Sequence, residues 1–375
     1  MDKEKGWGQK VIKEGKFGPQ EAICLIIIAI IAKVFYTSPA IVSSIVGTAG
    51  WYMTLISVSV AAIGFTFIYL LLKRFPGKDI IEIFEITMGR LLGFIFSALL
   101  AILMISIAAI RIREFSDVLK VYILPLTPMT FILILFIGAV ATLNILGLET
   151  IARLSKLIAY ATMTGFLIVI ILGQQNYNFN YIFPLLGNGM GKTILHGVIR
   201  SSVYGEVIAL AIFAPSLQGI KYIKKAGYTS LALSGLFTST ALLAFILTFP
   251  YYVAMEITSP MYEMATLIDY GRYLQRVDPI FLFIMTTTSI ISASVVTYAF
   301  VSIYCKMFRM QDSKPVILGA SIFSFAIALS QKNISVLTFE SVQGLRNYSG
   351  IIFFIPPIIS LIAAMLRKKG ETKNE

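Results

Sequence analysis

Long apolar segments without charge alternate with short polar connections along nearly the whole chain. Most of these segments have the roughly 18–25 residues that are needed to cross a bilayer core of about 30 Å as a helix. The connections are too short to hold a soluble domain. The pattern therefore predicts an all-α membrane protein with a single polytopic domain over residues 1–375 and ten spans, at about residues 18–46, 51–72, 91–123, 128–146, 150–172, 194–217, 227–252, 278–305, 315–331 and 348–366.

Lysine and arginine are distributed unevenly between the two sides of these spans. The loops on the side of the two termini carry 21 of them and the opposite loops carry six. Because positive residues in short loops stay in the cytoplasm, we expect both termini to be cytoplasmic. The polar, basic residues 1–16 precede an apolar helix that no small-residue cleavage site follows, so we expect no removable signal peptide.

Two connections carry helical patterns of their own. Residues 76–93 alternate charged and apolar positions at helical spacing, which predicts an amphipathic helix on the cytoplasmic surface. Residues 257–277 predict a short external helix that begins at Ser259 and Pro260, since proline favours the first turn of a helix. Both are better explained as connectors than as binding elements.

Two spans are interrupted by residues that break helices. Pro39 in residues 32–44 removes an amide donor and disfavours helical angles at Ser38. In residues 196–211, glycines at positions 197 and 205 bracket a polar run. The breaks fall in the first span of each expected half (residues 18–172 and 194–366), which favours an inverted repeat with a ligand site near the midplane. The alternative is that both are simple packing kinks.

Charged residues within spans need a partner or a cavity, because each costs at least about 2.5 kcal/mol at mid-membrane. Lys33 precedes the first break and could pair with Glu206 or take the place of a coupling cation; otherwise it extends to an interface or pairs only for structure. Arg200 and Glu206 lie on the second break at a spacing too wide for pairing, so each needs a partner elsewhere. Nothing else in the sequence supports proton coupling through Glu206.

The segment RIREFSDVLK, residues 111–120, places five charges at the end of an uncharged apolar run. A helix over residues 89–124 would be about 54 Å long, so these charges should lie in the outer leaflet or above it. Arg111 with Glu114 and Arg113 with Asp117 have the spacing of pairs along a helix. The segment either lines an external vestibule or is a solvated helix end, and the solvated end is the simpler interpretation.

Composition excludes several classes of function. The chain is 57% hydrophobic and 13% charged, and its net charge of +12 follows the loop asymmetry, so we expect a lipid bilayer and not nucleic acid as its surroundings. Two cysteines, Cys24 and Cys305, and a single histidine cannot form a disulfide framework or a histidine-based metal centre. With no nucleophile–base constellation either, we expect neither an enzyme nor a cofactor.

Several segments carry motifs that match one known family: KRFPGKDIIEIFE and GRLLG (73–93), REFSDVLKVYILPLTP (113–128), GLETIARL (147–154), YIFPLLGNG (181–189) and YGEVIALAIFAPSL (204–217). The REF and LPxTP elements in residues 113–128 are the most specific of these motifs, and the similarity extends over essentially the whole chain. By these motifs the chain resembles the endospore germination permeases, which are the B subunits of nutrient germinant receptors.

The resemblance implies a member of the amino acid–polyamine–organocation superfamily, with a five-plus-five inverted repeat like that of LeuT-type transporters. It also implies a sensor of amino acids or sugars that works with an A subunit and a lipoprotein C subunit in the spore inner membrane. The chain departs from the family at Ala32, Lys33 and Val34, where the family often has glycines. The usual germinant is therefore not to be assumed.

The leading hypothesis is a receptor subunit that binds a small nutrient between spans 1, 3, 6 and 8 and triggers germination. A secondary active amino-acid transporter and an ion or water channel that opens during germination are the alternatives. The expected ligand-binding residues lie around the two breaks and in span 8: Lys33, Tyr36, Thr37, Ser38, Ser201, Ser202, Tyr204, Gly205, Glu206, Ser292, Ser294 and Thr297.

Overall fold

A computed structural model describes residues 15–271, 277–331 and 341–370, and within these ranges the chain forms helices and no β-strand. The first half contains α1 (Pro19–Ile31), the 3₁₀ segments η1 (Ala32–Phe35) and η2 (Gly47–Ala49) around α2 (Ser38–Val46), α3 (Gly50–Arg74), α4 (Ile80–Met88), α5 (Arg90–Tyr122), α6 (Met129–Leu146) and α7 (Leu148–Leu172). The second half contains η3 (Gly173–Asn176), η4 (Phe179–Ile182), α8 (Met190–Ile199), η5 (Arg200–Ile208), α9 (Ala209–Ile212), η6 (Ala214–Ser216), α10 (Ile220–Thr248), α11 (Tyr251–Ala254), α12 (Pro260–Thr266), α13 (Asp278–Phe308), α14 (Lys314–Ser330) and α16 (Gln343–Leu366).

The ten expected spans are all present as helical segments. Eight stretches of the described chain are long and apolar enough to cross a membrane. The other two spans are α14, an apolar helix of 17 residues, and the interrupted first span, in which α1 has only 13 residues. The seventh span is displaced from its predicted limits: α10 begins at Ile220, after Gly219 with a φ of 131°, and ends at Thr248, before Pro250.

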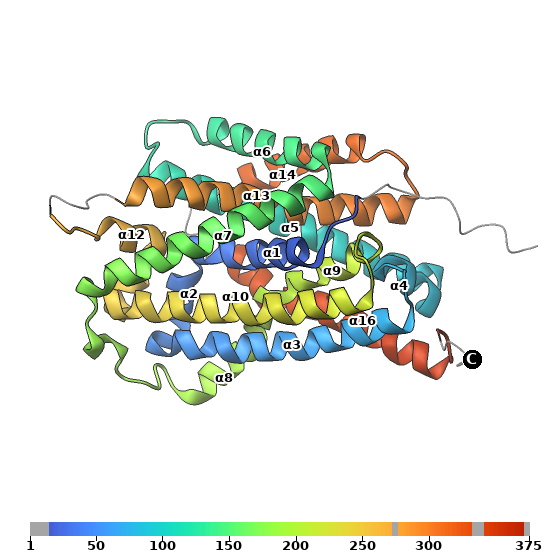
Figure 1. Ribbon diagram of the computed structural model, residues 1–375, viewed down its shortest axis with the longest axis horizontal. Coiled ribbons are helices and arrows are strands. Elements are labelled where there is room, and N and C mark those ends of the chain that lie inside the picture. The colour runs from blue at the N-terminus through green and yellow to red at the C-terminus, as the bar shows by residue number, and fades with distance from the viewer. Residues whose placement is uncertain (1–14, 272–276, 332–340, 371–375) are drawn as a thin grey trace, which may run out of the picture.

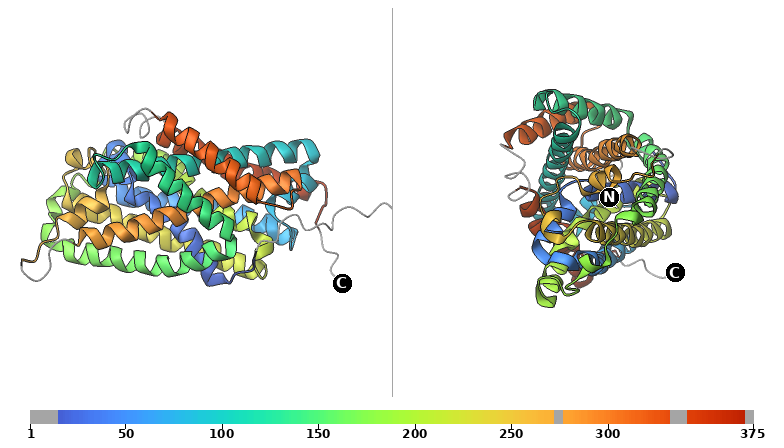
Figure 2. Two further views of the ribbon diagram at one scale, coloured as in Figure 1. Left: turned by 90° about the horizontal axis from the view of Figure 1, so that it is seen from above. Right: turned by 90° about the vertical axis from the view of Figure 1, so that its left-hand side faces the viewer.

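The axes of most long helices are roughly aligned, and α1 lies in the middle of the bundle between α7 and α10 (Figure 1). A helix that is apolar on all sides is a buried helix, and α1 is buried along nearly its whole length, from Ala22 to Ile31. It packs against α7, α10 and α13, and the end-on view shows the helices gathered into one bundle (Figure 2). Helices α6 and α14 lie on one outer side, against α5.

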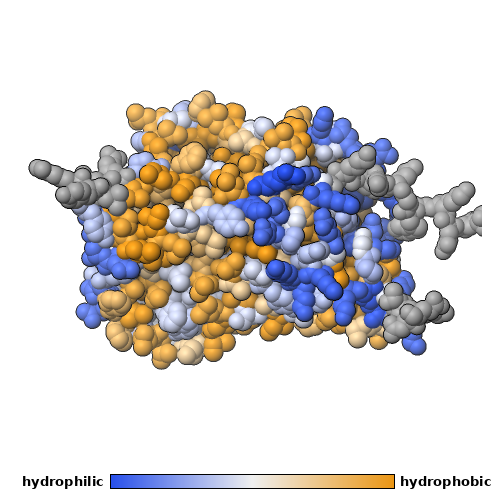
Figure 3. Space-filling view, viewed as in Figure 1, coloured by the Kyte–Doolittle hydropathy of each residue, from blue (hydrophilic) through white to orange (hydrophobic). Residues whose placement is uncertain are grey.

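The surface has the pattern of a protein embedded in a bilayer. Hydrophobic side chains cover much of the side view in Figure 3, and hydrophilic ones gather mainly towards the end where α4 and the C-terminal residues lie. Large apolar side chains such as Leu91, Ile102, Phe131 and Leu236 are more than 50% exposed on the surface of the chain. This exposure is what a membrane environment accommodates.

Both predicted connecting helices exist but are shorter than their sequence patterns. Helix α4 has nine residues, and the Asp79 carboxylate caps it by accepting hydrogen bonds from the amides of Ile81 and Glu82. Helix α12 begins at Pro260 as expected and has seven residues, and the Ser259 hydroxyl donates to the carbonyl of Phe35 in η1. The α12 connection therefore holds the interrupted first span in place.

Part of the charge asymmetry lies outside the described residues. The undescribed ranges hold the basic residues at positions 3, 5, 10, 13, 272, 276, 332 and 373. The expected absence of a signal peptide also concerns residues that lie largely outside the described ranges.

Candidate functional site

The first span is interrupted at its centre. Helix α1 ends at Ile31, η1 tightens the next four residues, and Tyr36 is extended with φ −102° and ψ −157° before α2 restarts at Ser38. Pro39 occupies the second position of α2, where its missing amide removes no helical hydrogen bond. The first span is therefore broken next to Pro39, as the sequence predicts.

The sixth span is interrupted by η5, a 3₁₀ segment of nine residues between α8 and α9. Runs of 3₁₀ helix longer than three or four residues are uncommon and often mark a functional hinge. Eight of the nine residues of η5 are buried. The two interrupted segments contact each other through α1 and η5 at the centre of the bundle.

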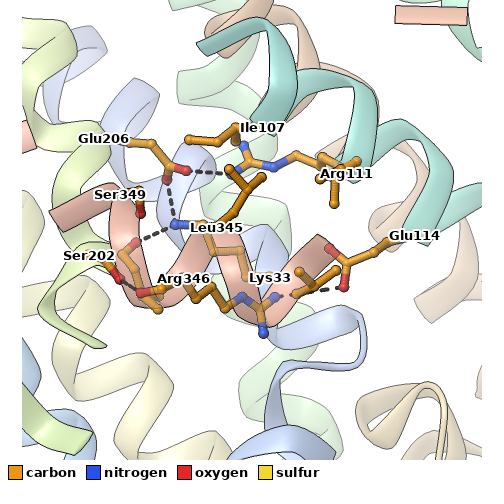
Figure 4. A pocket seen from close by; sticks show the side chains of 12 residues that line it. Lys33, Ile107, Arg111, Glu114, Ser202, Glu206, Leu345, Arg346 and Ser349 are labelled. Atoms are coloured by element: carbon orange, nitrogen blue, oxygen red, sulfur yellow. Dashed lines mark hydrogen bonds and ion pairs between the residues drawn. The ribbon is translucent and has the colours of Figure 1, made fainter. Parts of the chain in front are cut away.

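A chain of buried ion pairs joins the two interruptions to α5 (Figure 4). The Lys33 ammonium of η1 lies 2.6 Å from one carboxylate oxygen of Glu206 in η5, and also donates to the Val203 carbonyl. Arg111 of α5 donates to the other Glu206 oxygen at 2.7 Å and to the hydroxyl of Ser292 in α13 at 2.5 Å. Glu206 of η5 therefore connects η1 with α5, and Arg111 extends the network to α13.

A second set of contacts extends this network to α16. Glu114 of α5 accepts a hydrogen bond from the Thr37 hydroxyl at 2.7 Å and lies 3.7 Å from the Arg346 guanidinium. The Ser202 hydroxyl of η5 donates to the carbonyl of Arg346. The beginning of α16 is thus held against both interrupted spans (Figure 4).

These side chains surround a cavity of about 40 Å³, which is room for a few water molecules. Its charged groups are Lys33, Arg111, Arg346, Glu114 and Glu206, all at most 7% exposed, so positive charges exceed negative ones by one. The remaining lining residues are Ile107, Ile110, Ser202, Val203, Val342, Leu345 and Ser349. We refer to this cavity as the charged cavity.

The structure corrects two expectations about residues 111–120. Arg113 does pair with Asp117, at 3.0 Å, but Arg111 does not pair with Glu114, because each finds a closer partner on another element. Residues 111–118 are buried, so this part of α5 is not a solvated helix end. Arg111 and Glu114 instead line the charged cavity.

The expected ligand-binding residues divide into two groups. Lys33, Ser202 and Glu206 line the charged cavity, while Thr37 and Ser292 contact its charged residues. The others do not line it. Ser38 and Tyr204 line a second cavity, Gly205 packs against Phe353, and Tyr36 packs against Phe115. Ser294 and Thr297 donate to carbonyls of their own helix, and Ser201 is buried on η5.

Residues at the beginning of the last span are part of the cavity and were not among the expected ones. Val342, Leu345, Arg346 and Ser349 line it from the start of α16. The sequence offered a signal: Arg346 stands alone between uncharged residues directly before an apolar run. Arg346 is one of the six positive residues that the sequence pattern assigns to the loops opposite the termini, and this assignment concealed its place in the last span.

Two broken helices that meet at a buried polar cavity, within ten spans, define the LeuT-type class of transporter folds. The chain is similar in fold to a nucleobase-cation-symport-1 family transporter in a closed conformation with bromovinylhydantoin bound, with a TM-score of 0.62 and 10% identity over 94% of this chain and 93% of that one. It is also similar to a Na⁺-coupled sialic acid symporter in an outward-open state, with a TM-score of 0.53, 14% identity and coverage of 94% and 91%.

The chain belongs to the spore germination protein family, whose model matches residues 16–337. Over 347 residues it is 24% identical to spore germination protein KB of Bacillus subtilis, covering 88% of this chain and 91% of that protein. Spore germination protein A2 of the same organism is 23% identical, with coverage of 83% and 86%. The chain is therefore an integral membrane protein of the germinant receptor and permease kind, and family and fold together point to a non-enzymatic role.

Proposed function

We propose that this chain is the integral-membrane B subunit of a nutrient germinant receptor, and that it binds a small nutrient in the charged cavity and thereby triggers germination. The proposal includes an A subunit and a C subunit as partners and the spore inner membrane as its location, with both termini in the cytoplasm. Family membership and the curated relatives named as spore germination proteins support this assignment.

The observation that carries the proposal is the Lys33–Glu206–Arg111 chain of ion pairs, because it links both interrupted spans to α5. A cavity of about 40 Å³ is too small for most amino acids, so binding requires these elements to separate. A nutrient that replaces these ion pairs would favour the separated arrangement. Binding shifts a conformational equilibrium only through such a difference in affinity between two states.

The charges favour a nutrient that carries a carboxylate, such as an amino acid. One positive charge in the cavity is not balanced by an acidic side chain, and Arg111 and Arg346 present planar guanidinium groups suited to carboxylates. Glu114 and Glu206 offer acceptors for a ligand ammonium group. Lys33 stands where the resembled family often has a glycine, so it narrows the site and adds charge to it.

The first test uses spores that lack the gene, exposed to a panel of nutrients and then complemented with the wild-type gene or Lys33→Met. We expect deletion to abolish the response to at least one nutrient. We expect Lys33→Met to raise the concentration for half-maximal germination about tenfold or more, equivalent to about 1.4 kcal/mol of coupling. Lys156→Met is the matched control, since Lys156 pairs with Glu21 at 2.8 Å away from the cavity.

An unchanged dose–response in Lys33→Met, with normal amounts of the protein in the membrane, would contradict the assignment of the charged cavity. A response that both lysine variants lose equally would also contradict it, because the effect would then not be specific to the cavity.

A secondary active amino-acid transporter is the second candidate, because the two solved structures described above are symporters. Uptake into proteoliposomes separates the two functions. Saturable accumulation of the germinating nutrient, driven by an ion gradient, would establish transport. Binding of the nutrient without accumulation would favour a receptor.

A further inference from the structure

Arg200 is a buried cation without a partner. It begins η5 at 1% exposure, and in the described part of the chain its three guanidinium nitrogens have neither a hydrogen-bond acceptor nor an ion-pair partner. Four other buried cations in the described spans, Lys33, Arg111, Arg113 and Arg346, each lie within 4 Å of a carboxylate. Arg200 therefore needs a different explanation.

Burial without a counter-charge is costly for this side chain in particular. An arginine does not escape the cost by losing its proton, since its intrinsic pKa lies above 12. Water in a small cavity would satisfy some of its donors but would leave the charge uncompensated. A bound anion would supply both the acceptor and the counter-charge.

Arg200 lines a second cavity of about 20 Å³, which shares Val203 with the charged cavity. Hydroxyl groups of Ser38, Thr54, Ser57 and Thr238 also line it, and no acidic side chain does. The hydroxyls of Thr54, Ser57 and Thr238 now donate to carbonyls of their own helices, and rotation would turn them towards a ligand. Ser38 opens α2, whose first turn no side chain caps, so the positive end of that helix adds to the potential.

We propose that this second cavity binds a small monovalent anion of halide size, with chloride as the physiological candidate. The single guanidinium matches one negative charge, and the cavity volume fits a monatomic ion better than a nutrient. Hydroxyls and a helix N-terminus complete the shell of donors. The site is distinct from the charged cavity, but Val203 lines both, so the anion holds η5 in the position from which Glu206 reaches Lys33.

The test is the thermal stability of the purified full-length chain in detergent, without nutrient, while sodium gluconate is replaced by sodium chloride at constant ionic strength. We expect a saturable rise in Tm on the order of a few degrees, because a ligand that binds only the folded state stabilises it. Arg200→Met should lose this dependence on chloride. Arg153→Met should retain it, since Arg153 is exposed and forms only a surface pair with Glu149.

Crystals of the wild-type chain grown with bromide provide a second readout that needs no variant. An anomalous peak within hydrogen-bonding distance of the Arg200 guanidinium would support the proposal even if Arg200→Met failed to fold. Equal Tm values in gluconate and chloride would overturn it. The absence of a bromide peak in the second cavity would overturn it as well, and neither result depends on whether a nutrient binds in the charged cavity.

Discussion

Replacing Glu206 with glutamine is expected to destabilise the protein more than any other single change among the ion pairs of the charged cavity. Glu206 is 3% exposed and balances two cations, with Lys33 at 2.6 Å and Arg111 at 2.7 Å. Removing one partner from a buried ion pair costs about 3–5 kcal/mol, because the remaining charge stays buried without compensation. Thermal unfolding of the purified variant should show a Tm lower by several degrees, and spores carrying it should lose their nutrient response.

Glu149→Gln provides the matched control for this prediction. Glu149 pairs with Arg153 at 2.6 Å, but both side chains are at least 40% exposed. Surface pairs of this kind contribute about 0–1 kcal/mol, so the Tm should change little.

A second variant distinguishes charge pairing from a simple loss of packing. Adding Lys33→Met to Glu206→Gln removes one of the two cations that the glutamine leaves unpaired. The double variant should therefore be more stable than Glu206→Gln alone, with a coupling of about 0.5–3 kcal/mol, the range measured for residues in one network. Additive effects of the two substitutions would contradict the pairing in the charged cavity.

The second large effect is expected from Gly205→Ala, for a steric reason. A Cβ at Gly205 would lie 1.9 Å from the ring of Phe353 in α16, closer than any real contact. Overpacking of a core costs typically about 1–3 kcal/mol, and close approach through small residues is a regular feature of membrane helix interfaces. We expect a lower Tm and a weaker germination response, because α16 also carries Arg346 and Ser349 of the charged cavity.

Gly138→Ala is the control for this substitution, since a Cβ at Gly138 in α6 meets no atom within 4 Å. Alanine favours a helix over glycine by about 1 kcal/mol, so this variant should be as stable as the wild type or slightly more stable. Phe353→Leu should restore part of the stability lost in Gly205→Ala. Equal stability of the two alanine variants would contradict the close packing of η5 on α16.

The spans could be predicted because the hydropathy of each span reflects its lipid environment. A helix in lipid must be apolar over most of its length, and the limits of α3, α5, α6 and α7 agree with the hydropathy pattern within two residues. Pro39 and the glycines around η5 likewise predict both breaks from local chemistry. The family motifs added the class of fold, which the comparisons confirm.

The partners of the charged residues were harder to predict, because they depend on which elements meet. Helical spacing suggested Arg111 with Glu114, yet both bind residues on other helices. The Lys33–Glu206 pair was one of several alternatives in the sequence and is present in the structure. Pairing within one helix can be predicted from residue spacing, whereas pairing between helices depends on how the helices pack.

The contribution of α16 was missed for a similar reason. Arg346 lies in the first turn of α16 and was counted as part of an external loop, because the apolar run that marks the last span begins after it. Its burial comes entirely from neighbouring elements, with Glu114 of α5 on one side and Ser202 of η5 on the other. The sequence of residues 341–349 alone gives no indication of these neighbours.

Protection of a thiol in the charged cavity tests most directly whether a nutrient binds where the two broken spans meet. The substitution Ser349→Cys introduces a thiol into the lining of the charged cavity. The two buried native cysteines, Cys24 and Cys305, are changed to alanine in the same chain. The nutrient that germinates spores through this chain should slow modification of the introduced thiol by a small thiol reagent severalfold, while a non-germinating nutrient should not. An unchanged rate at a saturating concentration of that nutrient, in a variant that still germinates, would contradict the account.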